Sequence, residues 1–298
     1  MKLLTFLVFY TGLVTASFAQ QDTIVNPNSI ERIPYYEQLY RFRVWRTVDL
    51  QEKQNSGFKS AKSDIAKFLL ESIKSGAITV YNDSLTSVMT PEAVMVSNKA
   101  IDEPPYEPNK SYFINETANY KGRNYESTRN DNIGHLPNDV EWWQLSPNQT
   151  EYITKGNVVA MQVIEDVIFD KRRSRLYYDI QAIGILAQKG GSTDISPIGY
   201  IKYKEFYNLV EKVSHSKNMD ERDLVLWRNR YNPSENRTFV DAFKLRLFHG
   251  VIDKVENPGD YSITAIYINN GRSYGESIFA RWEEEMKMME KEHNLWEY

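Results

Sequence analysis

The sequence reads VVAMQVIEDVIFD at residues 158–170, KRRSR at residues 171–175 and LYYDIQAIGILA at residues 176–187. β-Branched and aromatic residues are frequent in the first and third of these segments, and such residues are favoured in strands. Alternate residues of the first segment share one face of a strand, and they are apolar except at Glu165. We therefore predict an antiparallel hairpin at the centre of a sheet, with the polar KRRSR segment as its turn.

Amphipathic helices are predicted on both sides of this hairpin, because apolar residues recur there at the three- and four-residue spacing of a helix. The last of these helices carries a row of apolar residues along its length, namely Ile278, Trp282, Met286 and Met289. The expected helices cover residues 60–75, 90–97, 202–213, 239–248 and 275–293.

Two of the predicted helices are each followed by a glycine and a short strand. Gly76 precedes a strand expected at 77–81, and Gly250 precedes a strand expected at 251–255. We expect both glycines to close their helices, because glycine readily adopts the left-handed conformation found after a helix C-terminus. The two passages are consistent either with an internal duplication or with independent helix capping.

The composition changes between residues 101 and 148, where Pro, Asn, Glu and Tyr become frequent. A connection of this length is either a functional or interface segment or a linker between two lobes. We expect an α+β fold with a mixed antiparallel sheet and several amphipathic helices, in two lobes joined by this Pro-rich segment. The expected divisions are a signal peptide (1–19), an extended N-terminal arm (20–34), an N-terminal helix–strand region (35–100), a Pro/Asn-rich loop or linker (101–148) and a C-terminal α+β domain (149–298).

The first residues predict export. Lys2 precedes an apolar run that continues to Val14, and Ser17-Phe18-Ala19 has the small-x-small pattern of a cleavage site. The alternative, a membrane anchor, is disfavoured because the run is shorter than the roughly 20 apolar residues that cross a bilayer. The chain contains no cysteine, which excludes disulfides, thiol nucleophiles and the acylated cysteine of a bacterial lipoprotein. We expect no direct membrane insertion of the mature chain and attachment, if any, through a partner protein.

Composition and motifs give little sign of a ligand site. The formal net charge of −4 argues against a nucleic-acid partner, which requires a clustered basic face. The phosphate-loop, dinucleotide and nucleophile-elbow motifs are absent from the sequence, so no cofactor is expected. We also expect no metal site, because no histidine has a second ligand at metal-binding spacing. The four histidines are His135, His215, His249 and His293.

A periplasmic carbohydrate-active enzyme or sugar-binding module is the alternative function. Paired carboxylates such as Glu165 and Asp166 serve glycoside chemistry, and Trp142 and Trp143 would supply sugar platforms. However, neighbouring residues of a strand point to opposite faces, and the acidic run 283–285 is predicted on the exposed side of its helix. We therefore prefer a protein without a catalytic site. The 20 tyrosines fit such a protein, since tyrosine is favoured at interfaces.

Several motifs resemble one family. VWRTVDLQEKQN at residues 44–55 is similar to the VWR-x-ID-L-x-EK-x-N opening of GldN/PorN proteins, and EHNLWEY at 292–298 is similar to their EH-x-LWEY terminus. Matches continue in order between these ends, including Glu165-Asp166, FDK at 169–171 and IGI at 183–185. The chain departs from the pattern at the proline-rich stretch 103–110.

This resemblance implies a non-enzymatic structural subunit of a periplasmic ring in the gliding motility and type IX secretion machinery. The implied partners are a GldK/PorK-type outer-membrane lipoprotein, a GldM/PorM-type periplasmic shaft protein and further copies of the same chain. The implied location is the periplasm, peripheral to the outer membrane through the lipoprotein. The C-terminal tail, residues 293–298, is expected to dock either on its own domain or on a neighbouring subunit. The expected partner-binding residues are Trp45, Arg46, Glu165, Asp166, Asp170, Lys171, Leu295, Trp296 and Tyr298.

Overall fold

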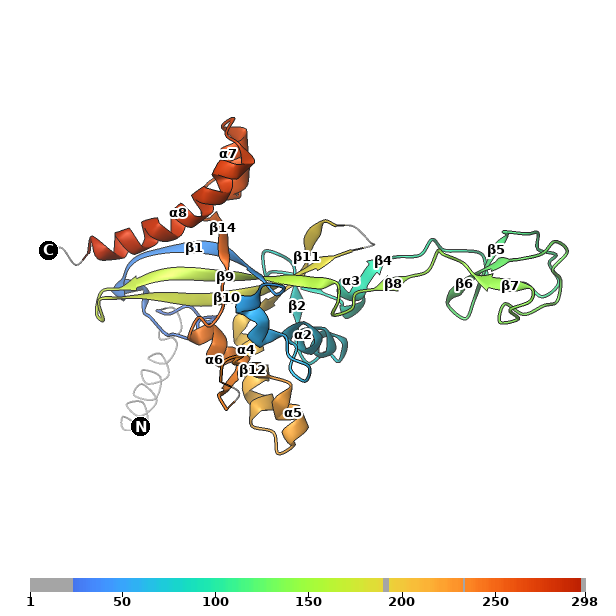
Figure 1. The fold of residues 1–298 in the computed structure, drawn as a ribbon, viewed down its shortest axis with the longest axis horizontal. Helices are drawn as coiled ribbons and strands as arrows, with labels where there is room; N and C mark the ends of the chain where they lie inside the picture. The colour runs from blue at the N-terminus through green and yellow to red at the C-terminus, as the bar shows by residue number, and fades with distance from the viewer. Residues whose placement is uncertain (1–23, 190–192, 233, 296–298) are drawn as a thin grey trace, which may run out of the picture.

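The computed structural model of the chain describes residues 24–189, 193–232 and 234–295. Its centre is a seven-stranded antiparallel sheet with the order β14-β1-β9-β10-β11-β2-β3, and helices pack around it (Figure 1). The predicted α+β class with an antiparallel sheet is confirmed. The strands of this sheet are β1 (Gln38–Asp49), β2 (Val80–Tyr81), β3 (Val88–Met89), β9 (Val158–Asp170), β10 (Arg175–Gln188), β11 (Ile195–Lys202) and β14 (Val251–Val255).

The predicted hairpin is confirmed as β9 and β10, which lie third and fourth in the order of the sheet. Asp170 and Arg175 face each other at its tip. Asp170 is buried, and its carboxylate accepts hydrogen bonds from the backbone N–H groups of Arg172 (2.9 Å) and Arg173 (3.3 Å). One carboxylate therefore holds a turn in which the flanking basic side chains are exposed.

The sequence pattern does not predict β1 and β11. In β1 the arginines Arg41, Arg43 and Arg46 interrupt the apolar alternation, and Arg46 is nevertheless buried. In β11, Pro197 and Gly199 resemble loop residues. Gly199 is needed there, because a Cβ atom would lie 2.3 Å from Cγ1 of Val80 on the neighbouring strand.

Helices and 3-10 turns build the main core against the sheet. Within it the ring of Phe58 stacks on that of Phe239 and packs at a tilt against that of Phe243, with centroids 5.9 and 5.4 Å apart. The helix predicted at 60–75 starts later, at the N-cap Asp64, whose carboxylate accepts from two backbone N–H groups. The elements are η1 (Tyr35–Glu37), η2 (Lys53–Phe58), α2 (Ile65–Lys74), α3 (Pro91–Met95), α4 (Tyr203–Ser214), α5 (Met219–Asp223), β12 (Leu226–Arg228), β13 (Asn236–Thr238) and α6 (Phe239–Lys244).

The prediction that Gly250 closes the helix at 239–248 is wrong. Helix α6 ends at Lys244, and Arg246 rather than a glycine takes the left-handed conformation, with φ of 52°. Gly250 lies in the following loop, where a Cβ atom would come within 3.0 Å of the Arg46 side chain. Gly76 does close α2, with φ of 71°. The two glycines therefore have different roles, and the observation that suggested an internal duplication is lost.

The Pro-rich segment forms a projection from the main body (Figure 1). It leaves the body at β4 (Val96–Asn98) and returns at β8 (Glu151–Tyr152), which pair with each other. At its far end β5 (Thr117–Tyr120), β6 (Arg123–Ser127) and β7 (Trp143–Leu145) form a separate sheet over a small core of Tyr112, Ala118 and Trp143. The segment thus contains ordered strands, and the domain boundaries themselves stay predictions.

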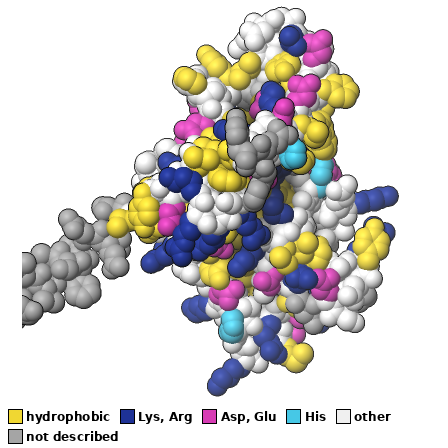
Figure 2. All heavy atoms as spheres, turned by 90° about the vertical axis from the view of Figure 1, so that its left-hand side faces the viewer, with side chains coloured by type: hydrophobic (Ala, Val, Ile, Leu, Met, Phe, Trp, Pro, Cys, Tyr) yellow, Lys and Arg dark blue, Asp and Glu magenta, His cyan; other side chains and the backbone are white. Residues whose placement is uncertain are grey.

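The C-terminal helices form a separate layer on the β14 side of the sheet (Figure 1). The helices α7 (Ile263–Asn269) and α8 (Tyr274–His293) contact each other and β14. Their contact with the sheet is a small cluster that includes Val44, Val167, Ile252 and Met288. Figure 2 views the end of the molecule where α8 terminates, and Lys and Arg side chains gather across the middle of this face, below the helices.

Residues 24–34 pack along the main body of the protein. The amide of Asn26 donates to the side chain of Gln181 (2.8 Å), Lys204 donates to the carbonyl of Pro27 (2.7 Å), and Ile33 is buried. The predicted signal peptide at 1–19 lies outside the described residues, as do Trp296 and Tyr298.

Candidate functional site

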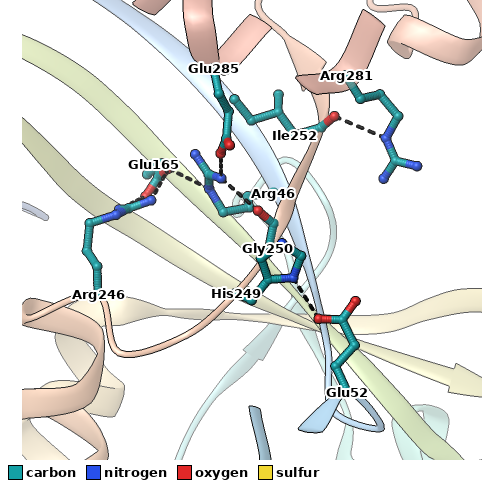
Figure 3. Close-up of polar contacts among 9 residues, drawn as sticks. All are labelled: Arg46, Glu52, Glu165, Arg246, His249, Gly250, Ile252, Arg281 and Glu285. Atoms are coloured by element: carbon teal, nitrogen blue, oxygen red, sulfur yellow. Dashed lines mark hydrogen bonds and ion pairs between the residues drawn. The ribbon is translucent and has the colours of Figure 1, made fainter. Parts of the chain in front are cut away.

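The structure brings two of the predicted site residues into one buried cluster beneath α8 (Figure 3). Arg46 comes from β1 and Glu165 from β9. The exposed fraction is 5% for Arg46 and 0% for Glu165. Met161 and Val163 of β9 lie in the main core, whereas Val167 belongs to the small cluster under the C-terminal helices. Glu165 therefore stands between the two apolar clusters.

Glu165 is held by two arginines. Nε of Arg46 donates to one of its oxygens (3.2 Å), and the guanidinium of Arg246 donates to both oxygens (2.7 and 3.2 Å). Burial raises the pKa of the Glu165 carboxyl, but the charges and hydrogen bonds of Arg246 and Arg46 outweigh burial and lower the pKa below its ordinary value. Glu165 is therefore a charged structural group at neutral pH.

Arg246 reaches this position through the way in which α6 ends. The N–H of Arg246 donates to the carbonyl of Phe243 (3.1 Å), and the N–H of Leu247 donates to the carbonyl of Ala242 (2.8 Å). These two bonds form a Schellman motif, which places Arg246 in the left-handed region. Its guanidinium then lies 4.2 Å from the ring centroid of Tyr178, in cation–π contact, on its way to Glu165.

The same network ties α8 to the sheet (Figure 3). The guanidinium of Arg46 also donates to the carbonyl of Gly250 (2.8 Å) and to the carboxylate of Glu285 on α8. One turn earlier in α8, Arg281 donates to the carbonyl of Ile252 (3.2 Å) and to the carboxylate of Asp253 on β14. In the first contact the sheet supplies the arginine and α8 the carboxylate, and in the second α8 supplies the arginine and the sheet the carboxylate. Together the two contacts fasten the helix to the sheet.

The charge of Arg46 is maintained within this network. Burial lowers the pKa of the Arg46 guanidinium, but the neighbouring carboxylates of Glu165 and Glu285 together raise the pKa above its ordinary value. Removing one partner of such a buried pair typically costs about 3–5 kcal/mol, because an uncompensated charge remains inside. We therefore expect the network to be a structural requirement.

Asp166 belongs to a second charged group. As predicted, it points away from Glu165, and Arg43 binds both of its oxygens (2.6 and 3.1 Å). Asp179 of β10 lies directly opposite Asp166 in the register and is buried. Burial, with a smaller contribution from the charge of Asp166, raises the pKa of Asp179 to about 6. Trp45 packs with Ile164 and its neighbours, under the ammonium group of Lys254.

The remaining predicted residues lie elsewhere. Asp170 builds the hairpin turn, and Lys171 is exposed beside it while its N–H donates to the carbonyl of Glu37 (2.8 Å). Leu295, just beyond α8, is exposed. Arg43, Arg246 and Glu285 are not among the predicted site residues, although each binds one of them. A buried glutamate on an apolar strand face was the available signal, since such a charge requires a cationic partner.

The arrangement gives no support to glycoside chemistry. The Glu165 oxygens are occupied by arginines, and Asp166 faces the other way. Trp142 and Trp143 lie in the projection, whereas Glu165 lies in the central sheet. Within residues 24–189, 193–232 and 234–295 no group of histidine and carboxylate side chains is arranged to hold a metal ion.

The sequence was compared with known proteins. The family described as gliding motility associated protein GldN matches residues 33–297. A search of the curated proteins found no match. The family match contains the strands, helices and ion network described above, because all of them lie within its limits.

Proposed function

Because the chain belongs to the GldN family, whose members are structural components of the gliding motility and type IX secretion machinery, we propose that it is a non-enzymatic subunit of a periplasmic ring in that machinery. In this proposal the chain assembles with a GldK/PorK-type outer-membrane lipoprotein and with further copies of itself. A GldM/PorM-type shaft protein lies next to the ring. The family match over nearly the whole chain is the observation that carries the proposal.

The chemistry of the described residues supports a scaffold. Charged side chains at the centre of the sheet form hydrogen-bonded ion pairs with one another, as the contacts of Glu165 with Arg46 and Arg246 illustrate. They also hold a helix in place, because Arg46 donates to the carboxylate of Glu285 on α8. We propose that the network serves to fix the position of α8 on the sheet.

The proposed location is the periplasm, at the inner surface of the outer membrane. None of the helices among the described residues is long and apolar enough to span a bilayer. The predicted signal peptide and the lack of cysteine motivate attachment through the lipoprotein.

Fractionation of cells tests this proposal. The chain should sediment with outer membranes when the lipoprotein is present and should appear in the soluble periplasmic fraction when the lipoprotein gene is deleted. An outer-membrane protein of unrelated function serves as the loading control. Equal sedimentation in the two strains would contradict attachment through the lipoprotein.

A further inference from the structure

The outward face of α8 is apolar. Phe279, Trp282, Met286 and Met289 recur at spacings of three, four and three residues, which is the pattern of the a and d positions in a coiled-coil seam. Each of these side chains is between 45% and 71% exposed, whereas the opposite side of the helix buries Ser277, Ala280 and Met288. We call the four exposed residues the α8 seam.

A row of large exposed apolar side chains such as the α8 seam is unusual on the surface of a soluble protein. Large contiguous apolar patches on soluble proteins mark interaction sites, and methionine-rich patches adapt readily to a partner's side chains. In the second half of the seam, Met286 and Met289 border an open stretch of surface together with Glu290, Glu292 and His293. Figure 2 shows hydrophobic side chains on the surface of the upper part of the molecule, where Figure 1 places α7 and α8.

The seam is flanked by glutamates on both sides. Glu283 and Glu290 occupy the e positions of the same heptad pattern, and Glu285 and Glu292 occupy the g positions. Glu285 contacts Arg46, whereas Glu283 and Glu290 are exposed, and the charge of Glu283 acts on Lys287 of the same helix. The flanks of the seam are therefore acidic, and one side has its charges open to a partner.

The acidic flanks of the α8 seam indicate which kind of partner could bind to it. Two α8 helices packed seam to seam would place glutamates opposite glutamates in either orientation, and like charges at e and g positions oppose pairing. A helix with Lys or Arg beside its apolar residues would bring opposite charges together. The acidic flanks likewise disfavour a membrane surface of anionic lipid.

We infer that the α8 seam docks an amphipathic helix of a partner protein whose apolar residues are flanked by basic side chains. The inference rests on the proposed function in one respect, since it supplies one partner contact of a ring subunit. It concerns the exposed side of α8, whereas the ion network holds the inner side of the same helix; Glu285 lies at the border of the two and contacts Arg46.

Two synthetic three-heptad peptides with leucine at every a and d position test the inference. One peptide carries lysine at the e and g positions, and the other carries glutamate. Binding to the purified full exported chain is measured by fluorescence anisotropy, without lipoprotein or cells, so the result is independent of the fractionation experiment. The lysine peptide should bind at least about tenfold more tightly than the glutamate peptide, a difference of roughly 1.4 kcal/mol.

A charge-adding variant separates docking from general electrostatic attraction. Met286→Glu makes the chain more acidic, so an attraction that depends only on net charge would hold or strengthen. The inference predicts that binding of the lysine peptide weakens by about tenfold or more. Met219→Glu is the matched control, because Met219 is also exposed but lies on α5, and it should leave binding unchanged. Exchange of Glu283 and Glu290 for lysine should reverse the preference between the two peptides.

The inference is overturned if neither peptide binds or if Met286→Glu binds the lysine peptide as tightly as the wild type does. Light scattering provides a second readout of the occupant. A wild-type dimer that becomes a monomer in Met286→Glu would identify a second copy of this chain, rather than a basic helix, as the occupant of the seam.

Discussion

Replacement of Glu165 by glutamine should strongly destabilise the protein. Glu165 is completely buried and receives donors from Arg46 and Arg246, of which Arg46 is itself 5% exposed. An amide in its place leaves the two guanidinium groups without their shared counter-charge and presents them with an N–H donor. Loss of one partner from a buried pair costs about 3–5 kcal/mol.

The free energy of unfolding is measured by urea denaturation at pH 7, followed by circular dichroism. Glu71→Gln is the matched control, because Glu71 forms an exposed pair with Lys67 on α2 and should contribute less than about 1 kcal/mol. A loss of about 3 kcal/mol should lower the melting temperature by roughly 6–12 °C for a protein of this size. A Glu165→Gln variant that is as stable as Glu71→Gln would refute the structural role given to the network.

Three further changes probe individual features. Arg246→Ala should be less stable than Arg246→Gly by about 1 kcal/mol in thermal melts, because φ is positive at this residue and both variants lose the same charge. Gly250→Ala should cost about 1–3 kcal/mol in urea denaturation, because the new methyl group would lie 2.9 Å from Val48. Asp179 has a pKa raised from 3.8 to about 6 in the folded state, so the folded protein binds more protons and its stability falls as pH rises from about 4 to 6. Asp179→Asn should remove this term, and its stability relative to the wild type should rise by about 2–3 kcal/mol between pH 4 and pH 8; equal pH profiles would contradict the assignment.

The central hairpin is predictable because its evidence is local. β9 and β10 are rich in apolar residues, many of them β-branched or aromatic, with one polar turn between them. β1 is not predictable in this way, since its arginines disrupt the alternation. The burial of Arg46 depends on Glu165, and Arg43 is bound by Asp166; both carboxylates lie more than a hundred residues away. The family resemblance marked this segment as important without indicating that it is a strand.

The limits of the α8 prediction have a similar cause. The apolar row of α8 predicts the helix correctly, but it does not reveal which face packs on the sheet. The small residues Ser277 and Ala280 allow a close approach, and Arg281 and Glu285 fasten that side by ion pairs. The prediction that residues 283–285 lie on the exposed side therefore holds for Glu283 alone. Glu284 and Glu285 are both partly buried, and Glu285 is held by Arg46.

The candidate site was only half visible in the sequence. Glu165 and Asp166 stand out as charges in an apolar segment, and the rule that neighbouring strand residues face opposite ways correctly separates them. The identity of their partners depends on the strand order of the sheet and on the left-handed turn at Arg246, which no local pattern around that arginine predicts.

Electron microscopy of the chain together with its lipoprotein partner tests the proposed ring most directly. The chain and a GldK/PorK-type lipoprotein are produced together and separately, purified in detergent and imaged by negative stain. The proposal predicts rings that contain both proteins and no comparable rings from either preparation alone. Rings formed by the lipoprotein without this chain, with the chain remaining a monomer in solution, would contradict its role as a structural ring subunit.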